Sequence, residues 1–205
     1  MIDSKLILLG GFGRSGTTGI RELLRGHPDI TSSKKSEFRM LTDPGGLISL
    51  KNVFVDNWTF WRGDHAIHEF NDFCKNLNSK WFGGYALSNF KAEFYGNFEE
   101  ANKQLLDHLV LSSYNGIWGK HANIFNKSLS WLLNKKKLKL INRKIYITDP
   151  IDYSQFKKFT RDYFNTLIKK KLHNEGASMY ILDEPFISQN PKECIEITGA
   201  NKLII

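Results

Sequence analysis

The sequence has 205 residues, of which 41% are hydrophobic and 24% are charged. This composition is that of an ordinary globular protein and excludes a chain that is disordered throughout. The length suits one domain with a full hydrophobic core, so we expect a single domain over residues 1–205. The formal net charge of +8 predicts a surface that attracts phosphates, acidic glycans, nucleic acid or anionic lipid, and charge alone does not choose among them.

No segment predicts a membrane span, a signal peptide or a disulfide. The apolar run Leu6–Leu9 is too short for a signal-peptide core, and no run of about 18 apolar residues occurs. Cys74 and Cys194 lie in predicted helices without the spacing of metal ligands, so we expect both to be reduced and structural. We therefore expect a soluble, cytoplasmic protein.

The N-terminal residues predict a strand, a glycine-rich turn and a helix. Lys5–Leu9 is a short, continuously apolar run that ends in glycines, as is typical of a strand buried on both faces of a parallel sheet. The spacing of Ile20, Leu23 and Leu24 predicts a helix after the glycines. A second strand is expected at Ile30–Ser33, so the segment opens a βαβ unit.

Residues from about 51 to 145 are rich in aromatic side chains and predict a helical insertion. One helix is expected at Ala66–Leu77 and another after Asn97, where Asn97 and Glu100 resemble a capping box. The basic run Lys135–Lys144 is either a solvated surface or a collar around an acidic substrate.

The C-terminal part returns to the α/β pattern. A helix is expected at Ser154–Leu172, a buried strand at Met179–Leu182, and a short helix from Asn190 to Gly199. Asp183 follows the strand at the edge where α/β proteins bind ligands. The apolar run Lys202–Ile205 predicts either a fragment of a longer polypeptide or a final strand of the sheet. The expected fold is α/β, a P-loop-like three-layer fold with a central parallel sheet and a helical, aromatic-rich insertion.

The glycine loop departs from a nucleotide-binding loop at one position. Gly11, Gly16 and Thr18 fit the P-loop pattern G-x-x-x-x-G-K-[ST], but Thr17 stands where the lysine belongs. In a P-loop that lysine reaches the β- and γ-phosphates of a magnesium-bound triphosphate. The loop keeps its glycines, two hydroxyls and a helix N-terminus, and it adds the five donors of Arg14. It predicts a site for a phosphate-like group that needs less positive charge.

Several segments resemble the sulfotransferases that use 3'-phosphoadenosine 5'-phosphosulfate (PAPS). Arg14–Thr18 matches every position of their 5'-phosphosulfate loop, [RK]-[ST]-G-T-[ST]. His27–Pro28 and the glutamate-containing segment Lys35–Arg39 follow as in the branch of the family with an RSGTT loop. Asp183–Pro185 and Asn201–Ile205 resemble later segments of the family, and the middle of the chain shows no resemblance.

The resemblance implies a sulfotransferase that moves a sulfuryl group from PAPS to a hydroxyl or amine, with no metal. The residues expected to bind the cofactor are Gly13, Arg14, Ser15, Gly16, Thr17 and Thr18. Glu37 would be the catalytic base and Arg14 would stabilise the leaving phosphate, because negative charge grows there during in-line transfer. On composition alone Glu37 reads as a solvated surface carboxylate. Arg39 would hold an acidic group of the substrate or the cofactor, or would pair with Glu37.

Two departures from the family bear on these expectations. Family members follow the last strand with an arginine and a serine that hold the cofactor's 3'-phosphate, and this sequence ends before them. We therefore expect this chain alone to bind PAPS poorly, with little activity or none by itself. The Asp183–Pro185 segment lacks the family's frequent Lys-Thr, so Asp183 either orients substrate or loop, or forms a turn.

Two other functions stay open. The first is a divergent P-loop nucleotide kinase or NTPase, which the missing lysine disfavours. The second is a non-catalytic anion or nucleic-acid binder driven by the +8 charge. The expected acceptor is a small molecule or a glycan, with a carbohydrate, a phenol or a peptide all compatible with the sequence, and no specific nucleic-acid partner is expected.

Overall fold

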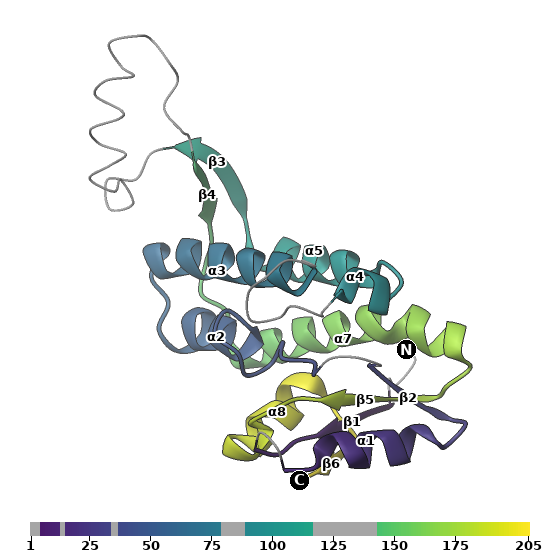
Figure 1. Cartoon of the computed structure of the whole chain (residues 1–205). Helices are drawn as coiled ribbons and strands as arrows, with labels where there is room; N and C mark the ends of the chain where they lie inside the picture. Colours follow the sequence, from purple (N-terminus) through teal and green to yellow (C-terminus); the bar gives the residue numbers. More distant parts are fainter. Residues whose placement is uncertain (1–4, 13–14, 34–36, 79–88, 117–142) are drawn as a thin grey trace, which may run out of the picture.

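The computed structural model describes residues 5–12, 15–33, 37–78, 89–116 and 143–205. In this part of the chain a parallel sheet of strand order β2-β5-β1-β6 forms the centre of a mixed α/β fold (Figure 1). Its strands are β1 (Lys5–Leu9), β2 (Ile30–Ser32), β5 (Met179–Asp183) and β6 (Lys202–Ile204). Helices cover both faces of the sheet, which confirms the expected three-layer α/β class.

The strand register brings the ends of distant segments together. β1 pairs with β5 so that Leu9 lies opposite Asp183, and β2 pairs with β5 so that Ser32 lies opposite Ile181. On its other side β1 pairs with β6. Because all these strands are parallel, their carboxyl ends lie at one edge of the sheet, which is where open α/β sheets bind ligands.

The two faces of the sheet are covered unequally. Alternate residues of a strand point to opposite faces. On one face Ile7, Leu9 and Ile181 form a small buried cluster against α1 (Thr17–Arg25). On the other face Leu8 and Leu182 join the main hydrophobic core, to which the helices of the larger layer contribute.

Helix α1 exists as predicted, but its buried side is not the apolar one. Ile20 is 40% exposed and Leu23 is 79% exposed, whereas Leu24 is partly buried against the sheet. The buried residue of the helix is Arg21. The apolar spacing therefore predicted the helix correctly without indicating which side faces the protein.

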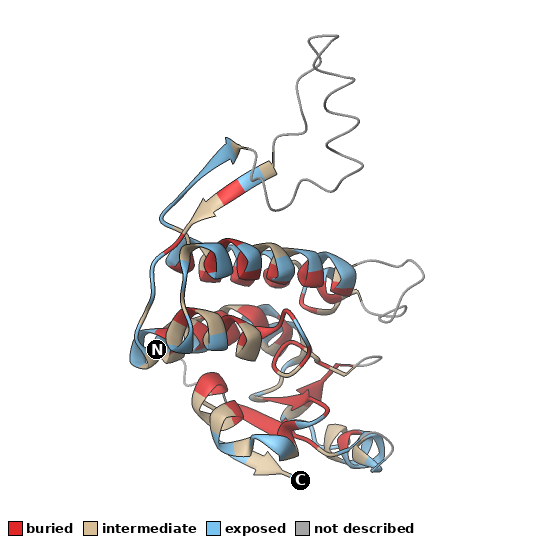
Figure 2. Ribbon diagram, turned by 90° about the vertical axis from the view of Figure 1, so that its left-hand side faces the viewer, coloured by how far each residue is buried: buried red, intermediate tan, exposed pale blue. Residues whose placement is uncertain are grey.

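The remaining helices form two layers on the other side of the sheet. They are α2 (Leu47–Lys51), the π-helical turn η1 (Asn52–Asp56), α3 (Phe60–Asn78), α4 (Phe90–Glu93), α5 (Asn97–Leu109), α7 (Tyr153–Glu175), the 3-10 turn η3 (Ile187–Gln189) and α8 (Pro191–Thr198). Helix α7 lies between the sheet and the layer of α3, α4 and α5 (Figure 1). Buried residues concentrate where these layers face one another (Figure 2). Cys74 and Cys194 are both buried and free.

The start of α5 differs from the expected capping box. The N-cap is Gly96, with φ 83°, and no side chain caps the helix. Asn97 is buried, and its Nδ2 donates to the carbonyl oxygen of Thr166 at 2.7 Å. The predicted pairing of Asn97 with Glu100 is therefore wrong, because the asparagine bonds to the neighbouring helix α7 instead.

An antiparallel hairpin projects from the helical layer and was not predicted. It consists of β3 (Ser112–Gly116) and β4 (Arg143–Ile147) (Figure 1). β3 is mostly exposed, whereas β4 is mostly half-buried and its Ile145 is buried (Figure 2). Of the basic run, residues 135–142 lie outside the described residues, while Lys144 is on β4 with its Nζ 5.3 Å from the ring centroid of Tyr146. None of the helices in the described part combines the length and apolar character needed to cross a bilayer.

Candidate functional site

The glycines after β1 are needed because the backbone passes close to other atoms. A Cβ atom added at Gly10 would lie 2.7 Å from Cβ of Ile187, and one added at Gly11 would collide with Oγ of Ser15. Real Cβ atoms do not approach this closely, so the strand can turn into the loop here only without side chains. The loop begins at the carboxyl edge of the sheet, as the sequence predicted.

The N-terminus of α1 is suited to an anion. Gly16 adopts φ 90° as the N-cap, and no side chain of the described residues caps the helix. The hydrogen bonds to the Gly16 carbonyl come from the amides of Gly19 and Ile20, at 3.0 and 3.3 Å. The amides of Thr17 and Thr18 precede them, in the first turn where a helix has no internal acceptors. Such amides and the helix dipole favour a phosphate or sulfate group.

Part of the expected cofactor loop is outside the described residues. Gly13 and Arg14 belong to this part, so the roles predicted for them stay predictions. Ser15, Gly16 and Thr18 are exposed, and Thr17 is half-buried. The residues that are described thus lie at the surface, next to the uncapped end of α1.

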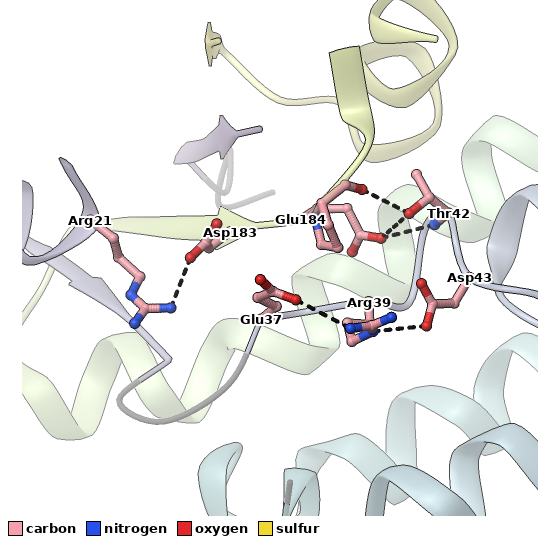
Figure 3. Close-up of polar contacts among 8 residues, drawn as sticks. Arg21, Glu37, Arg39, Thr42, Asp43, Asp183 and Glu184 are labelled. Carbon is pink, nitrogen blue, oxygen red and sulfur yellow. Dashed lines mark hydrogen bonds and ion pairs between the residues drawn. The ribbon is translucent and has the colours of Figure 1, made fainter. Parts of the chain in front are cut away.

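A buried ion pair joins α1 to the end of β5. Nη1 of Arg21 donates to Oδ2 of Asp183 at 2.8 Å, and the two residues are only 6% and 4% exposed (Figure 3). Burial raises the pKa of Asp183 above its usual value, the Arg21 charge opposes this, and the nearby Glu37 carboxylate adds to it. The sequence left open whether Asp183 orients the substrate or the loop, or forms a turn. In the structure its carboxylate contacts α1, the helix that follows the glycine loop. Sequence reasoning did not identify Arg21.

Glu37 lies at the same edge of the sheet, after β2. The backbone N–H of Phe38 donates to the carbonyl oxygen of Asp183 at 2.7 Å, which brings this segment beside the end of β5. Glu37 is half-buried, and its Oε2 lies 3.3 Å from Nη1 of Arg39. Figure 3 shows the Glu37 carboxylate between Asp183 and Arg39. The structure thus brings Glu37 and Asp183 together, and of the roles left open for Arg39 it shows the contact with Glu37.

Arg39 connects Glu37 to a second carboxylate. Its Nε donates to Oδ2 of Asp43 at 2.8 Å, and Asp43 is buried. The backbone of Arg39 has φ 62°, a conformation that is uncommon outside glycine and that often marks functional segments. Sequence reasoning did not identify Asp43, which lacks any local pattern.

A buried carboxyl follows Asp183 directly. Glu184 is 0% exposed, and its Oε1 accepts a hydrogen bond from the N–H of Thr42 at 2.9 Å and is hydrogen-bonded to the hydroxyl oxygen of Thr42 at 2.7 Å (Figure 3). Burial raises the pKa of Glu184 to about 8, and the hydrogen bonds from Thr42 oppose this shift only in part. Two adjacent carboxyls at the end of β5 therefore hold two different segments, with Asp183 bound to α1 and Glu184 to the chain after Glu37.

One hollow in the described part of the chain lies away from this site. A hollow of about 530 Å³ lies between α3, α5 and the hairpin, with Asn71, Asn102, Lys103 and Tyr146 among its lining residues, and it contains no predicted site residue. Within the described ranges no three His, Cys, Asp or Glu side chains gather in a way that could hold a metal ion.

Comparisons of the chain with models of protein families, with curated proteins and with solved structures found no match in any of the three.

Proposed function

We propose that this chain is a PAPS-dependent sulfotransferase that transfers a sulfuryl group to a hydroxyl or amine acceptor. The observation that carries the proposal is the meeting of two features at one edge of the sheet. The uncapped N-terminus of α1 follows a glycine loop without the P-loop lysine, and Glu37 lies beside the end of the adjoining strand β5. The first suits an anionic donor and the second suits a base for the acceptor.

Each part of this site has a distinct role in the proposed reaction. When bound, PAPS supplies the sulfuryl group and a phosphate leaving group. The amides of Thr17 and Thr18, with Arg14, hold the anion and stabilise the negative charge that grows on the leaving oxygen. Glu37 accepts the proton of the acceptor, and Arg39 orients the Glu37 carboxylate through their contact.

The structure supplies one argument against the nucleotide kinase or NTPase alternative. Asp183 follows β5, beside β1, where such enzymes place a magnesium-binding aspartate. Its carboxylate is instead bound to Arg21 in a buried pair. A cation next to this carboxylate competes with a metal ion for it, so the geometry favours the sulfotransferase proposal.

Titration calorimetry with PAPS, 3'-phosphoadenosine 5'-phosphate and magnesium-ATP side by side tests the donor site. We expect the two 3'-phosphorylated nucleotides to bind and magnesium-ATP to bind more weakly. The nucleotides are titrated into the millimolar range so that weak binding is also measured. A non-catalytic anion binder would show no preference among the three and a steep loss of affinity with salt.

Two loop variants test the residues of the donor site by the same titration. Arg14→Ala should weaken binding about 10- to 100-fold, because it removes charge-assisted hydrogen bonds, and Thr17→Ala about tenfold. Arg62→Ala on the exposed surface of α3 removes the same charge away from the loop and should leave affinity unchanged. Equal losses of nucleotide affinity in Arg14→Ala and Arg62→Ala would show that binding depends on overall charge and not on a specific site.

The acceptor side is tested by Glu37→Gln. Loss of a general base lowers turnover by about 10²- to 10⁴-fold, while donor affinity should stay within about twofold of the unmodified chain. Transfer from radiolabelled PAPS to p-nitrophenol, to a tyrosine peptide and to a desulfated glycosaminoglycan measures turnover and identifies the acceptor class. Normal turnover in Glu37→Gln would reject Glu37 as the base.

A further inference from the structure

We propose that Glu184 is a positioning residue for the acceptor side of this site: its buried carboxyl fastens the segment Glu37–Asp43 to the end of β5 and thereby sets the place of Glu37. The importance of Glu37 rests on the proposed function. The fastening itself is a property of the fold and can be tested without any assumption about the reaction.

The segment is attached to β5 at two points. Near its start the N–H of Phe38 donates to the carbonyl oxygen of Asp183 at 2.7 Å. Near its end Thr42 donates its N–H to Oε1 of Glu184 at 2.9 Å, and its hydroxyl oxygen forms a second hydrogen bond with the same Oε1 at 2.7 Å. The two acceptors belong to adjacent residues of the chain, so both attachments join the segment to one short stretch at the carboxyl edge of the sheet.

Between these points the chain leaves the sheet and returns, with Arg39 at φ 62°. The guanidinium of Arg39 contacts Glu37 on one side, at 3.3 Å, and Asp43 on the other, at 2.8 Å. A displacement of Thr42 and Asp43 would therefore move Arg39, and Arg39 would move the Glu37 carboxylate. Figure 3 shows this succession of contacts from Glu184 to Glu37.

The hydrogen-bond geometry around Thr42 fits a neutral carboxylic acid. The hydroxyl oxygen of Thr42 lies 2.7 Å from Oε1 of Glu184 and 2.9 Å from the carbonyl oxygen of Pro185. A hydroxyl has one proton and can donate to only one of these oxygens. A proton on Glu184 supplies the second hydrogen bond, so the hydroxyl can donate to Pro185 while it accepts from the acid. Burial raises the pKa of Glu184 to about 8, which also favours the neutral acid.

Packing alone does not explain a glutamate at this position. A buried carboxyl loses the solvation that it has in water, and Oε2 of Glu184 is buried without a hydrogen-bond partner among the described residues. An apolar side chain of similar size would avoid this cost but could not bind Thr42. The acceptor oxygen is therefore the feature of Glu184 that the fold uses.

Hydrogen exchange of the whole chain, followed by mass spectrometry, tests the fastening. Glu184→Leu keeps the volume and removes the acceptor, so exchange in peptides covering residues 37–46 should rise about 10- to 100-fold, as expected for a lost buried hydrogen bond. Peptides of α1 and β1 should exchange as before. Glu184→Gln keeps an acceptor oxygen and should restore exchange to within about threefold of the unmodified chain.

Thr160→Val is the matched control for general loss of stability. The buried hydroxyl of Thr160 lies 2.8 Å from the carbonyl oxygen of Ile197 on α8 and can donate its one proton to it, so its removal disturbs the packing of two helices. This variant should raise exchange around α7 and α8 and leave residues 37–46 unchanged. Thr42→Val provides a second test from the other partner, with a smaller effect because the N–H of Thr42 remains.

Transfer assays then test the consequence for the site. In Glu184→Leu the turnover number should fall about tenfold or more while the dissociation constant for 3'-phosphoadenosine 5'-phosphate stays within about twofold, and Glu184→Gln should recover most of the turnover. Unchanged exchange at residues 37–46 in Glu184→Leu would overturn the proposal. So would an equal loss of turnover in Thr160→Val. If the unmodified chain binds no PAPS, the proposed function fails, and the exchange experiment still decides whether Glu184 fastens the segment.

Discussion

At the scale of single residues, the carboxyl edge of the sheet gathers acidic groups in very different surroundings. Asp183 is buried beside a cation, whereas Glu184 is buried beside a threonine and a carbonyl group. Glu37 is half-buried between Asp183 and Arg39. These surroundings separate the roles, because a buried neutral acid serves as a fastening group and a half-buried carboxylate can accept a proton.

The burial of Glu184 predicts a pH dependence of stability. The folded state raises its pKa from 4.5 to about 8, so the folded chain keeps a proton that the unfolded chain has released. The stabilisation is complete below pH 4.5 and is lost as the pH rises through 8. Of the groups that face Glu184, the Asp43 carboxylate also raises this pKa, whereas the hydrogen bonds from Thr42 and from the backbone of Leu41 lower it in part.

Urea unfolding between pH 5 and pH 9 measures this effect. The free energy of unfolding should fall by about 2–4 kcal/mol over this range, since each pKa unit corresponds to about 1.4 kcal/mol and the shift is an upper bound. Glu184→Gln cannot release a proton and should remove most of the decline. Parallel curves for the two proteins would show that Glu184 is not the titrating group.

At the scale of elements, the connection from β1 to α1 depends on glycines for different reasons. Gly10 has no room for a side chain, because its Cβ would lie 2.7 Å from Cβ of the buried Ile187. Gly19 lies inside α1, and a Cβ added there would meet nothing within 4 Å. The two residues are therefore a matched pair, in which the same substitution should have opposite effects.

Gly10→Ala should lower the free energy of unfolding by about 1–3 kcal/mol, as for other overpacked positions. Gly19→Ala should raise it by about 0.5–1 kcal/mol, because alanine loses less conformational entropy in a helix. Thermal unfolding followed by circular dichroism measures both changes. A loss of stability in both variants would mean that α1 does not tolerate side chains on its exposed side.

At the scale of the whole molecule, α7 connects the sheet to the outer helices through a buried charge. Lys171 of α7 is 1% exposed, and its Nζ binds Glu93 of α4 and Glu175, the latter at 3.2 Å. The hydroxyl of Thr31 on β2 also donates to Glu175. Lys171 thus binds one carboxylate of α4 and one of α7. Thr31 connects the second of these to β2, an outermost strand of the sheet.

Lys171→Met should destabilise the protein by about 3–5 kcal/mol, because it leaves two partly buried carboxylates without their cation. Lys170→Met, on the exposed side of the same helix, should change stability by less than about 0.5 kcal/mol. Urea unfolding at pH 7 compares the two variants. The difference in the free energy of unfolding between the two variants should become smaller near pH 4, where the carboxylates bind protons. A difference that is independent of pH would contradict the electrostatic explanation.

Features that depend on residues close together in the sequence were mostly predicted from it. The apolar runs identified β1 and β5, because a strand buried on both faces needs consecutive apolar residues. The placement of Glu37 at the ligand-binding edge also followed from the sequence, because it comes after a strand parallel to β1. The capping box expected at Asn97 was wrong, because a bond to α7 replaced the local one.

The sequence by itself determined the parallel α/β class, the glycine loop before α1 and the edge of the sheet at which the candidate residues gather. Only the tertiary structure shows that Arg21 is the buried residue of α1 and that Glu184 binds Thr42 in the segment after Glu37. These contacts join residues 162 and 142 positions apart, as in Arg21 with Asp183 and Thr42 with Glu184. A local pattern carries no information about such partners, because each side chain's role is set by what the folded chain places beside it.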